Sequence, residues 1–203
     1  MSTTRLAAHD DAESEHVVGI DLGVRNLLTA SLATTDPDLS NALVVDGDPS
    51  RRLYAELAER DDAPVEPYAQ VLESRFEQAI ADLDAFVDEP EEIAVESLAY
   101  PEPGPLADAI DDGTDAGAWL MGRMRAHIDA WARRTETTVV EVFPENTSRE
   151  CHACGAAGAR TSDNRFVCPD ESCAVEHVHA DAGAAASIAR RAVQGRRIIG
   201  GSE

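Results

Sequence analysis

Four cysteines lie close together near the C-terminal end of the sequence and could bind one metal ion. Cys151-His-Ala-Cys154-Gly is followed, after thirteen intervening residues, by Cys168-Pro-Asp-Glu-Ser-Cys173. Each short spacing lets two sulfurs from one turn reach the same ion, and four thiolates complete the tetrahedral geometry of zinc. Gly155 stands where such a turn needs a permissive backbone. We therefore predict a structural Zn²⁺ bound by the four cysteines.

Three other interpretations of these cysteines remain open. A redox Cys-x-x-Cys pair would explain Cys151 and Cys154 but would leave the second pair without a role. His177 or His179 could replace Cys173 as the fourth ligand. A catalytic zinc is disfavoured because four sulfur ligands leave no open position for water.

Three carboxylates are the other candidates for chemistry. With 39 acidic residues in the chain, most Asp and Glu side chains must be solvated surface groups. Asp21, however, interrupts the apolar run that begins at Val17, and Glu96 ends the apolar run Ile93-Ala-Val. An unpaired carboxylate is costly in a sheet interior unless it meets a cation. Asp181 opens an alanine-rich helix that could bring a third acid to the same place.

Carboxylates that converge in this way are typical of sites for hard cations such as Mg²⁺ or Mn²⁺. Two such ions could stabilise the attacking and leaving oxygens of a phosphoryl displacement, which is nuclease chemistry. Each acid also has a plainer interpretation. Asp21 could be a buried acid bonded to backbone amides, and Asp181 could be a helix N-cap.

The elements that must position these residues follow from the hydrophobic periodicity. Short apolar, largely β-branched runs separated by turn residues predict strands, and apolar residues at three-to-four spacing predict helices. The predicted strands cover 17–20, 27–30, 42–45, 93–95 and 137–143; the predicted helices cover 67–87, 119–131 and 181–192. An antiparallel meander followed by alternating helices and strands favours an α/β fold, a mixed sheet covered by helices on both faces.

The domain boundaries follow the same pattern. We predict a disordered lead-in over 1–15, a core over 16–145 and a small zinc ribbon over 146–180. The final core helix covers 181–194, and a loose tail covers 195–203.

Charge and hydropathy constrain the surroundings of the protein. The net charge is −22, every basic residue is arginine, and the acidic residues are spread along the chain. This pattern favours a halophilic, salt-adapted surface, and at about 1 M salt charges are screened beyond about 3 Å. No apolar run approaches the roughly 20 residues that span a bilayer, so we expect no membrane partner and a cytoplasmic location.

Four segments resemble a known family. Val18-Gly-Ile-Asp21-Leu-Gly-Val-Arg-Asn26 is similar to the first motif of the RuvC-like nuclease domain in the transposon-encoded, RNA-guided TnpB proteins. Ile93-Ala-Val-Glu96-Ser-Leu98 resembles the second motif and Asp181-Ala-Gly-Ala-Ala185 the third. Between them, the segment from Val142 through Pro144, Thr147 and Ser148 to Gly155 resembles the start of the zinc ribbon in that family.

The resemblance implies a fold, an activity and partners. The fold would be RNase H-like (RuvC-like) with an inserted zinc ribbon, and Asp21, Glu96 and Asp181 would form the catalytic triad that binds Mg²⁺ or Mn²⁺. The function would be that of a transposase-associated DNA endonuclease, with DNA and a guide RNA as partners. Only about 15 residues precede the first motif, so we also expect a separate N-terminal recognition protein.

Two functions from other classes compete with this one. The chain could be a catalytically inactive, nucleic-acid-binding remnant or regulator that keeps the sheet and the ribbon. Gly19-Ile-Asp-Leu-Gly23 also resembles the first phosphate loop of actin-like and sugar-kinase-like ATPases. That superfamily needs a second nucleotide-binding lobe, for which this sequence has no room.

Overall fold

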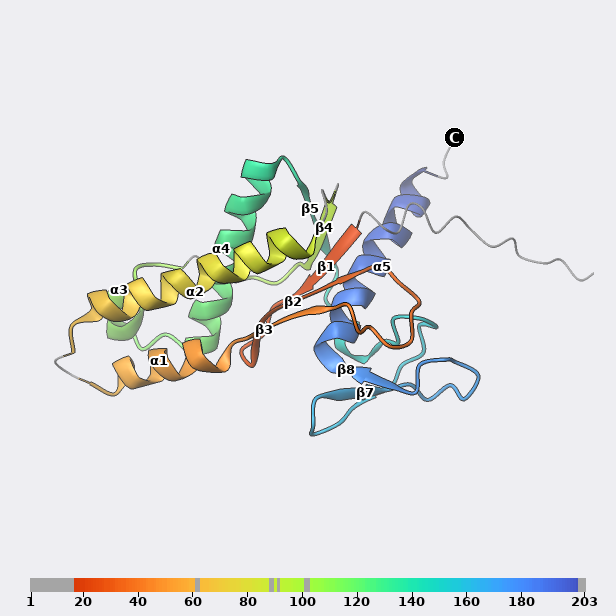
Figure 1. Ribbon diagram of the computed structural model, residues 1–203, viewed down its shortest axis with the longest axis horizontal. Coiled ribbons are helices and arrows are strands. Elements are labelled where there is room, and N and C mark those ends of the chain that lie inside the picture. Colours follow the sequence, from red (N-terminus) through yellow and green to blue (C-terminus); the bar gives the residue numbers. More distant parts are fainter. Residues whose placement is uncertain (1–16, 61–62, 88–89, 91, 101–102, 201–203) are drawn as a thin grey trace, which may run out of the picture.

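A computed structural model describes residues 17–60, 63–87, 90, 92–100 and 103–200. The predicted lead-in over 1–15 lies outside these residues. A central sheet has the strand order β3-β2-β1-β4-β5 (Figure 1). Its strands are β1 (Val17–Asp21), β2 (Asn26–Leu32), β3 (Leu43–Asp46), β4 (Glu92–Glu96) and β5 (Thr138–Val142).

The sheet is mixed, as predicted. Strands β1, β2 and β3 form an antiparallel meander, whereas β4 pairs parallel to β1 and β5 pairs parallel to β4. Parallel neighbours need a crossover, and each one here contains a helix. The strand order and the two layers of helices confirm the RNase H-like fold.

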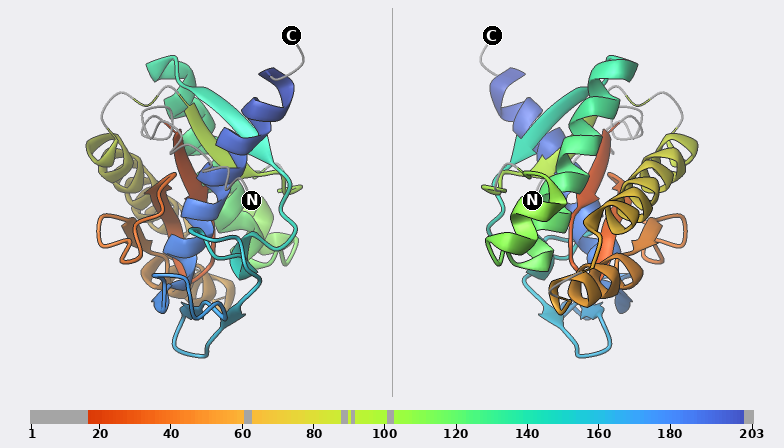
Figure 2. Two further views of the ribbon diagram at one scale, coloured as in Figure 1. Left: turned by 90° about the vertical axis from the view of Figure 1, so that its right-hand side faces the viewer. Right: turned by 90° about the vertical axis from the view of Figure 1, so that its left-hand side faces the viewer.

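The first layer of helices packs on the even-numbered side chains of β1, such as Val18 and Ile20. Figure 2 shows these helices in front of the sheet in its right-hand view. Successive residues of a strand point to opposite faces, so the β-branched runs supply one half of this core. The helices are α1 (Asp48–Ala58), α2 (Val65–Phe86), α3 (Leu106–Asp111) and α4 (Ala116–Thr135).

Helices α1 and α3 correct the predicted element order, which passed directly from the meander to α2 and from β4 to α4. Helix α1 buries only Ser50, Tyr54 and Leu57, so its apolar stripe is sparse and its periodicity is weak. Helix α3 follows Pro105 and is six residues long, in a segment rich in Pro, Gly and Asp. Short helices of this kind are stabilised by tertiary packing rather than by their own sequence.

Helix α5 (Ala180–Gly200) covers the opposite face of the sheet (Figure 2, left). Its residues Ile188 and Ala189 pack with Val17 and Ala94 of the sheet. The helix continues past residue 194 to Gly200, so the expected loose tail from 195 begins too early; residues 201–203 lie outside the described part. Within that described part, none of the helices has the length and hydropathy to cross a membrane.

The cysteine segment forms a second, small sheet beside the first turn of α5 (Figure 1). A 3₁₀ turn, η2 (Thr147–Arg149), leads from β5 into strands β6 (Ala159–Arg160), β7 (Arg165–Val167) and β8 (His177–His179). The three strands are antiparallel in the order β6-β7-β8. Strand β8 passes directly into α5, so the small sheet is joined to the start of that helix.

Candidate functional site

Asp21 and Glu96 end two neighbouring parallel strands. The register pairs Gly19 with Ala94 and Ile20 with Val95, which brings Asp21 and Glu96 next to each other at the carboxyl end. Because side chains alternate along a strand, both acids share the face of Val17 and Ala94, which α5 covers. Two of the three predicted acids therefore lie side by side.

Asp181 reaches the same place because α5 lies close to the sheet. A Cβ on Gly19 would lie 2.0 Å from the carbonyl oxygen of Ala185, so only glycine permits this contact. Asp181 is in the first turn of α5, with 6% of its surface exposed. The first turn of a helix also favours a negative charge.

The three carboxylates interact electrostatically. Burial raises the pKa of Asp21 well above its ordinary value, and the negative charges of Asp181 and Glu96 raise it further. The positive charge of Arg160 opposes this rise in the pKa of Asp21. A bound cation would therefore favour the ionised form of Asp21.

Asp181 is held by three donors. Its Oδ2 accepts hydrogen bonds from Asn26 Nδ2 at 2.5 Å and from Asn164 Nδ2 at 3.1 Å. Its Oδ1 lies 2.7 Å from the guanidinium of Arg160. Burial acts to raise the pKa of Asp181, but these hydrogen bonds and the positive charge of Arg160 outweigh it, and the pKa is lowered. Asp181 therefore stays ionised beside Asp21.

Glu96 is held from the start of the ribbon. The hydroxyl of Thr147, which is buried, is hydrogen-bonded to Oε1 of Glu96. The same hydroxyl lies 3.1 Å from the carbonyl oxygen of Pro144. Thr147 thus ties the carboxylate of β4 to the turn that precedes the cysteines.

Tyr100 adds a neutral donor near the acids. Burial raises the pKa of its phenol to about 12, with contributions from the negative charges of Glu96 and Asp21. The positive charge of Arg125 acts in the other direction. The phenol therefore keeps its proton across the physiological range.

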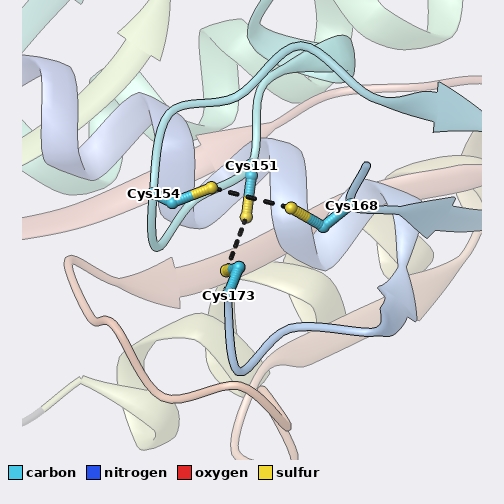
Figure 3. A group of neighbouring side chains, drawn as sticks. All are labelled: Cys151, Cys154, Cys168 and Cys173. Atoms are coloured by element: carbon cyan, nitrogen blue, oxygen red, sulfur yellow. Dashed lines mark hydrogen bonds between the residues drawn. The ribbon is translucent and has the colours of Figure 1, made fainter. Parts of the chain in front are cut away.

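The four cysteine sulfurs converge on one point (Figure 3). All four lie within 4.8 Å of one another, close enough to hold one metal ion together. Cys151 and Cys173 Sγ are 3.9 Å apart, and Cys154 and Cys168 Sγ are 3.6 Å apart. Four sulfurs at about 2.3 Å from a tetrahedral zinc are about 3.8 Å apart, so the donors fit this ion.

The backbone around the first cysteine pair supports that geometry. Gly155 has φ +81°, a left-handed conformation that favours glycine, as the sequence predicts. The amide of Gly155 donates to the carbonyl of Cys151 at 2.8 Å, and the amide of Ala156 donates to Cys154 Sγ at 3.4 Å. The fourth sulfur comes from Cys173, whereas His179 lies outside the cluster, with its Nε2 3.3 Å from the side-chain nitrogen Nδ2 of Asn164.

The comparisons with known proteins agree with this arrangement. The family described as "Cas12f1-like, TNB domain" matches residues 122–188, from α4 to the first half of α5. A cryo-EM structure of a Cas12f1–sgRNA–target DNA complex matches 85% of this chain with a TM-score of 0.58 and 18% identity. A CRISPR–Cas12f ternary complex matches 85% with a TM-score of 0.56 and 16% identity. No curated protein sequence matches the chain.

Residues 122–188 thus resemble the TNB domain of Cas12f1-like proteins, and the chain shares its fold with the two Cas12f structures. It spans 49% of the first of those solved proteins and 38% of the second, so about half of their length or less. At these identities the likeness to the solved structures concerns the fold, which is the RNase H-like sheet with the cysteine ribbon.

The sequence patterns did not assign a role to four of the residues that surround the acids. Thr147 and Asn26 lie within the quoted motifs, but their patterns did not indicate a role. Asn164 had a weak signal, since Asn is among the residues that tolerate a left-handed backbone in a turn. Nothing in the pattern marked Arg160, because its contact with Asp181 depends on how the ribbon packs against α5.

Proposed function

We propose that this chain is the divalent-metal-dependent DNA endonuclease core of a TnpB-like, transposase-associated protein. In this proposal Asp21, Glu96 and Asp181 hold Mg²⁺ or Mn²⁺. The observation that supports it is the strand register that puts Asp21 beside Glu96, together with the negative charges of Asp181 and Glu96, which add to burial in raising the pKa of Asp21. The three carboxylates come from β1, β4 and α5, three elements far apart in sequence.

The chemistry of the donors supports a hard cation. Carboxylate oxygens are the ligands that Mg²⁺ and Mn²⁺ prefer, and mutual repulsion among three of them is relieved by a cation. When bound, a pair of such ions stabilises the attacking and leaving oxygens of an in-line phosphoryl displacement. The chain itself orients the acids: Thr147 holds Glu96, while Asn26 and Asn164 hold Asp181.

We further propose a structural zinc ion held by Cys151, Cys154, Cys168 and Cys173. Four sulfur donors at this spacing fill a tetrahedral shell and leave no position for a substrate. The ion therefore supports the fold of the ribbon and takes no part in hydrolysis.

The proposed partners are DNA as substrate and a guide RNA. The matched complex that contains Cas12f1 also contains sgRNA and target DNA. With a net charge of −22, the chain should repel nucleic acid at low salt, so binding is best measured where charges are screened.

The test is cleavage of labelled single- and double-stranded DNA in molar KCl with Mg²⁺ or Mn²⁺, comparing the native chain with Asp21→Ala. Cleavage by the native chain that disappears in the variant is the expected result. Cleavage that survives in Asp21→Ala would contradict the proposed triad. Guide RNA should be included in a parallel series, because the matched Cas12f1 complex contains an sgRNA.

A second function, binding without cleavage, is favoured by one observation. Arg160 already pairs with Asp181, so a cation from the protein itself neutralises one of the acids. An inactive relative would keep this pair and would bind nucleic acid without any divalent ion. Metal-independent binding to single strands, with no cleavage under any divalent ion, would support this alternative.

A further inference from the structure

Asn164 is a buried polar residue at the turn between β6 and β7. Its backbone has φ +62°, and 7% of its surface is exposed. A buried amide side chain is costly unless its donors and acceptor are all used. Its partners therefore indicate what the residue is for.

The side-chain partners of Asn164 lie around the acidic site. Besides the contacts that follow, its side-chain nitrogen Nδ2 lies 3.3 Å from Nε2 of His179, on the strand that leads into α5. The side-chain amide donates to Oδ2 of Asp181 at 3.1 Å, and its oxygen accepts a hydrogen bond from Arg160. The backbone oxygen of Asn164 accepts from the amide of Ala180 at 2.9 Å, the first residue of α5. One ribbon residue thus holds both the start of the helix and its carboxylate.

Asn164 also works together with Asn26 to orient that carboxylate. Both amides donate to Oδ2 of Asp181, one from β2 of the core and one from the ribbon. A carboxylate whose one oxygen is held by two donors cannot rotate freely. The other oxygen, Oδ1, is the one that faces a cation, namely the guanidinium of Arg160.

We propose that Asn164 is a positioning residue that turns Oδ1 of Asp181 toward the divalent cation, so that the zinc ribbon sets the affinity of the carboxylate site. This inference rests on the proposed metal site. The ribbon also reaches the neighbouring acid, because Thr147 at its start is bonded to Glu96. Partners that orient a metal-binding side chain typically change metal affinity by about 10–100-fold when they are removed.

Asn164→Gly isolates the side chain. Glycine adopts φ +62° without strain and keeps the backbone oxygen that accepts from Ala180. Asn146 provides the matched control, because it has φ +66°, lies at the start of η2 and has an exposed side chain. Asn146→Gly is therefore the same chemical change in the same backbone conformation, away from Asp181.

The experiment is a Mn²⁺ titration of the full, zinc-loaded chain in molar KCl, followed by electron paramagnetic resonance, with zinc content measured for each variant. We expect Asn164→Gly to weaken Mn²⁺ binding by about 10-fold or more with unchanged zinc. Asn146→Gly should bind Mn²⁺ as the native chain does, and Asp21→Ala should lose binding.

Each of the other possible outcomes would contradict a specific part of the proposal. Native affinity in Asn164→Gly, with binding lost in Asp21→Ala, would remove the positioning role and leave the metal site standing. Loss of zinc in Asn164→Gly, or equal weakening in Asn146→Gly, would assign the effect to ribbon folding and contradict the inference. Absence of Mn²⁺ binding by the native chain would overturn the proposed metal site and this inference together.

Discussion

Gly19 of β1 and Ala185 of α5 meet backbone to backbone. A Cβ on Gly19 would lie 2.0 Å from the carbonyl oxygen of Ala185 and 2.5 Å from the amide nitrogen of Ala189. Neither atom can rotate away, because both belong to the helix backbone. The distance between the sheet and α5, and with it the position of Asp181, depends on this one missing side chain.

Gly19→Ala should therefore lower the free energy of unfolding by about 3 kcal/mol or more, at or above the upper end of the 1–3 kcal/mol that is typical of overpacking. It should also weaken Mn²⁺ binding, because the added methyl group pushes α5 off the sheet and moves Asp181 away from Asp21. Chemical denaturation and a Mn²⁺ titration measure the two effects. Gly104→Ala is the control, because a Cβ there has no atom within 4 Å; equal stability of the two variants would contradict the prediction.

Asp21→Asn should stabilise the metal-free protein at neutral pH. Burial, reinforced by Asp181 and Glu96, raises the pKa of Asp21 in the folded state. A group with a raised folded pKa binds more protons folded than unfolded, so stability is lost as the pH rises from the ordinary Asp range through the raised pKa. Asparagine does not ionise, so the variant should not lose this stability as the pH rises.

Thermal melts of both chains in chelator, from pH 4 upward, provide the measurement. The native Tm should fall relative to the variant as the pH rises. The same substitution at the exposed Asp111 should leave the native pH dependence in place. Parallel curves for the native chain and Asp21→Asn would show that burial does not perturb this acid.

Thr147→Val should weaken divalent-cation binding by about 10-fold, because it removes the hydroxyl that holds Glu96 while keeping the shape of the side chain. It should also cost about 1.5–3 kcal/mol of stability, which is typical of losing a hydrogen bond to a charged group. Thr147→Ser keeps the hydroxyl and should restore the affinity. A Mn²⁺ titration with matched melting curves distinguishes the two effects, and equal affinities of the Val and Ser variants would contradict the role of the hydroxyl.

The native chain should contain one zinc ion per molecule. Chelation of that ion should lower the Tm of the protein, because the free energy of metal binding adds to the stability of such a ribbon. Cys154→Ser should lose the ion. His177→Ala should retain it, because the fourth sulfur of the cluster belongs to Cys173. Native mass spectrometry gives the stoichiometry, and zinc loss in the histidine variant would revive the alternative ligand set.

Much of the fold was predictable because its signals are local. The β-branched runs, the wide apolar stripes of α2 and α4, and the turn glycine at 155 each follow from neighbouring residues. The shared face of Asp21 and Glu96 follows from the period of two along β1 and β4. Helix α1 was missed because few of its residues are buried.

The surroundings of the acids were less predictable because they depend on tertiary packing. Arg160 and Asn164 reach Asp181 only because the hairpin β6–β7 packs against the first turn of α5. Sequence spacing places them inside the ribbon and carries no information on that contact. The same holds for Tyr100, whose pKa is raised by burial and, to a smaller extent, by acids on two strands.

The apolar contacts of the ribbon have a consequence for how the molecule unfolds. Cys151, Phe166 and Val178 pack with Ala182 and Ala186 of α5 in one cluster. A domain as small as the ribbon cannot bury enough apolar surface to fold by itself. Here part of its core is supplied by α5, which also packs on the large sheet. Sheet, helix and ribbon should therefore melt in a single cooperative transition, and a ribbon exchanged between relatives would have to bring the matching stripe of α5 with it.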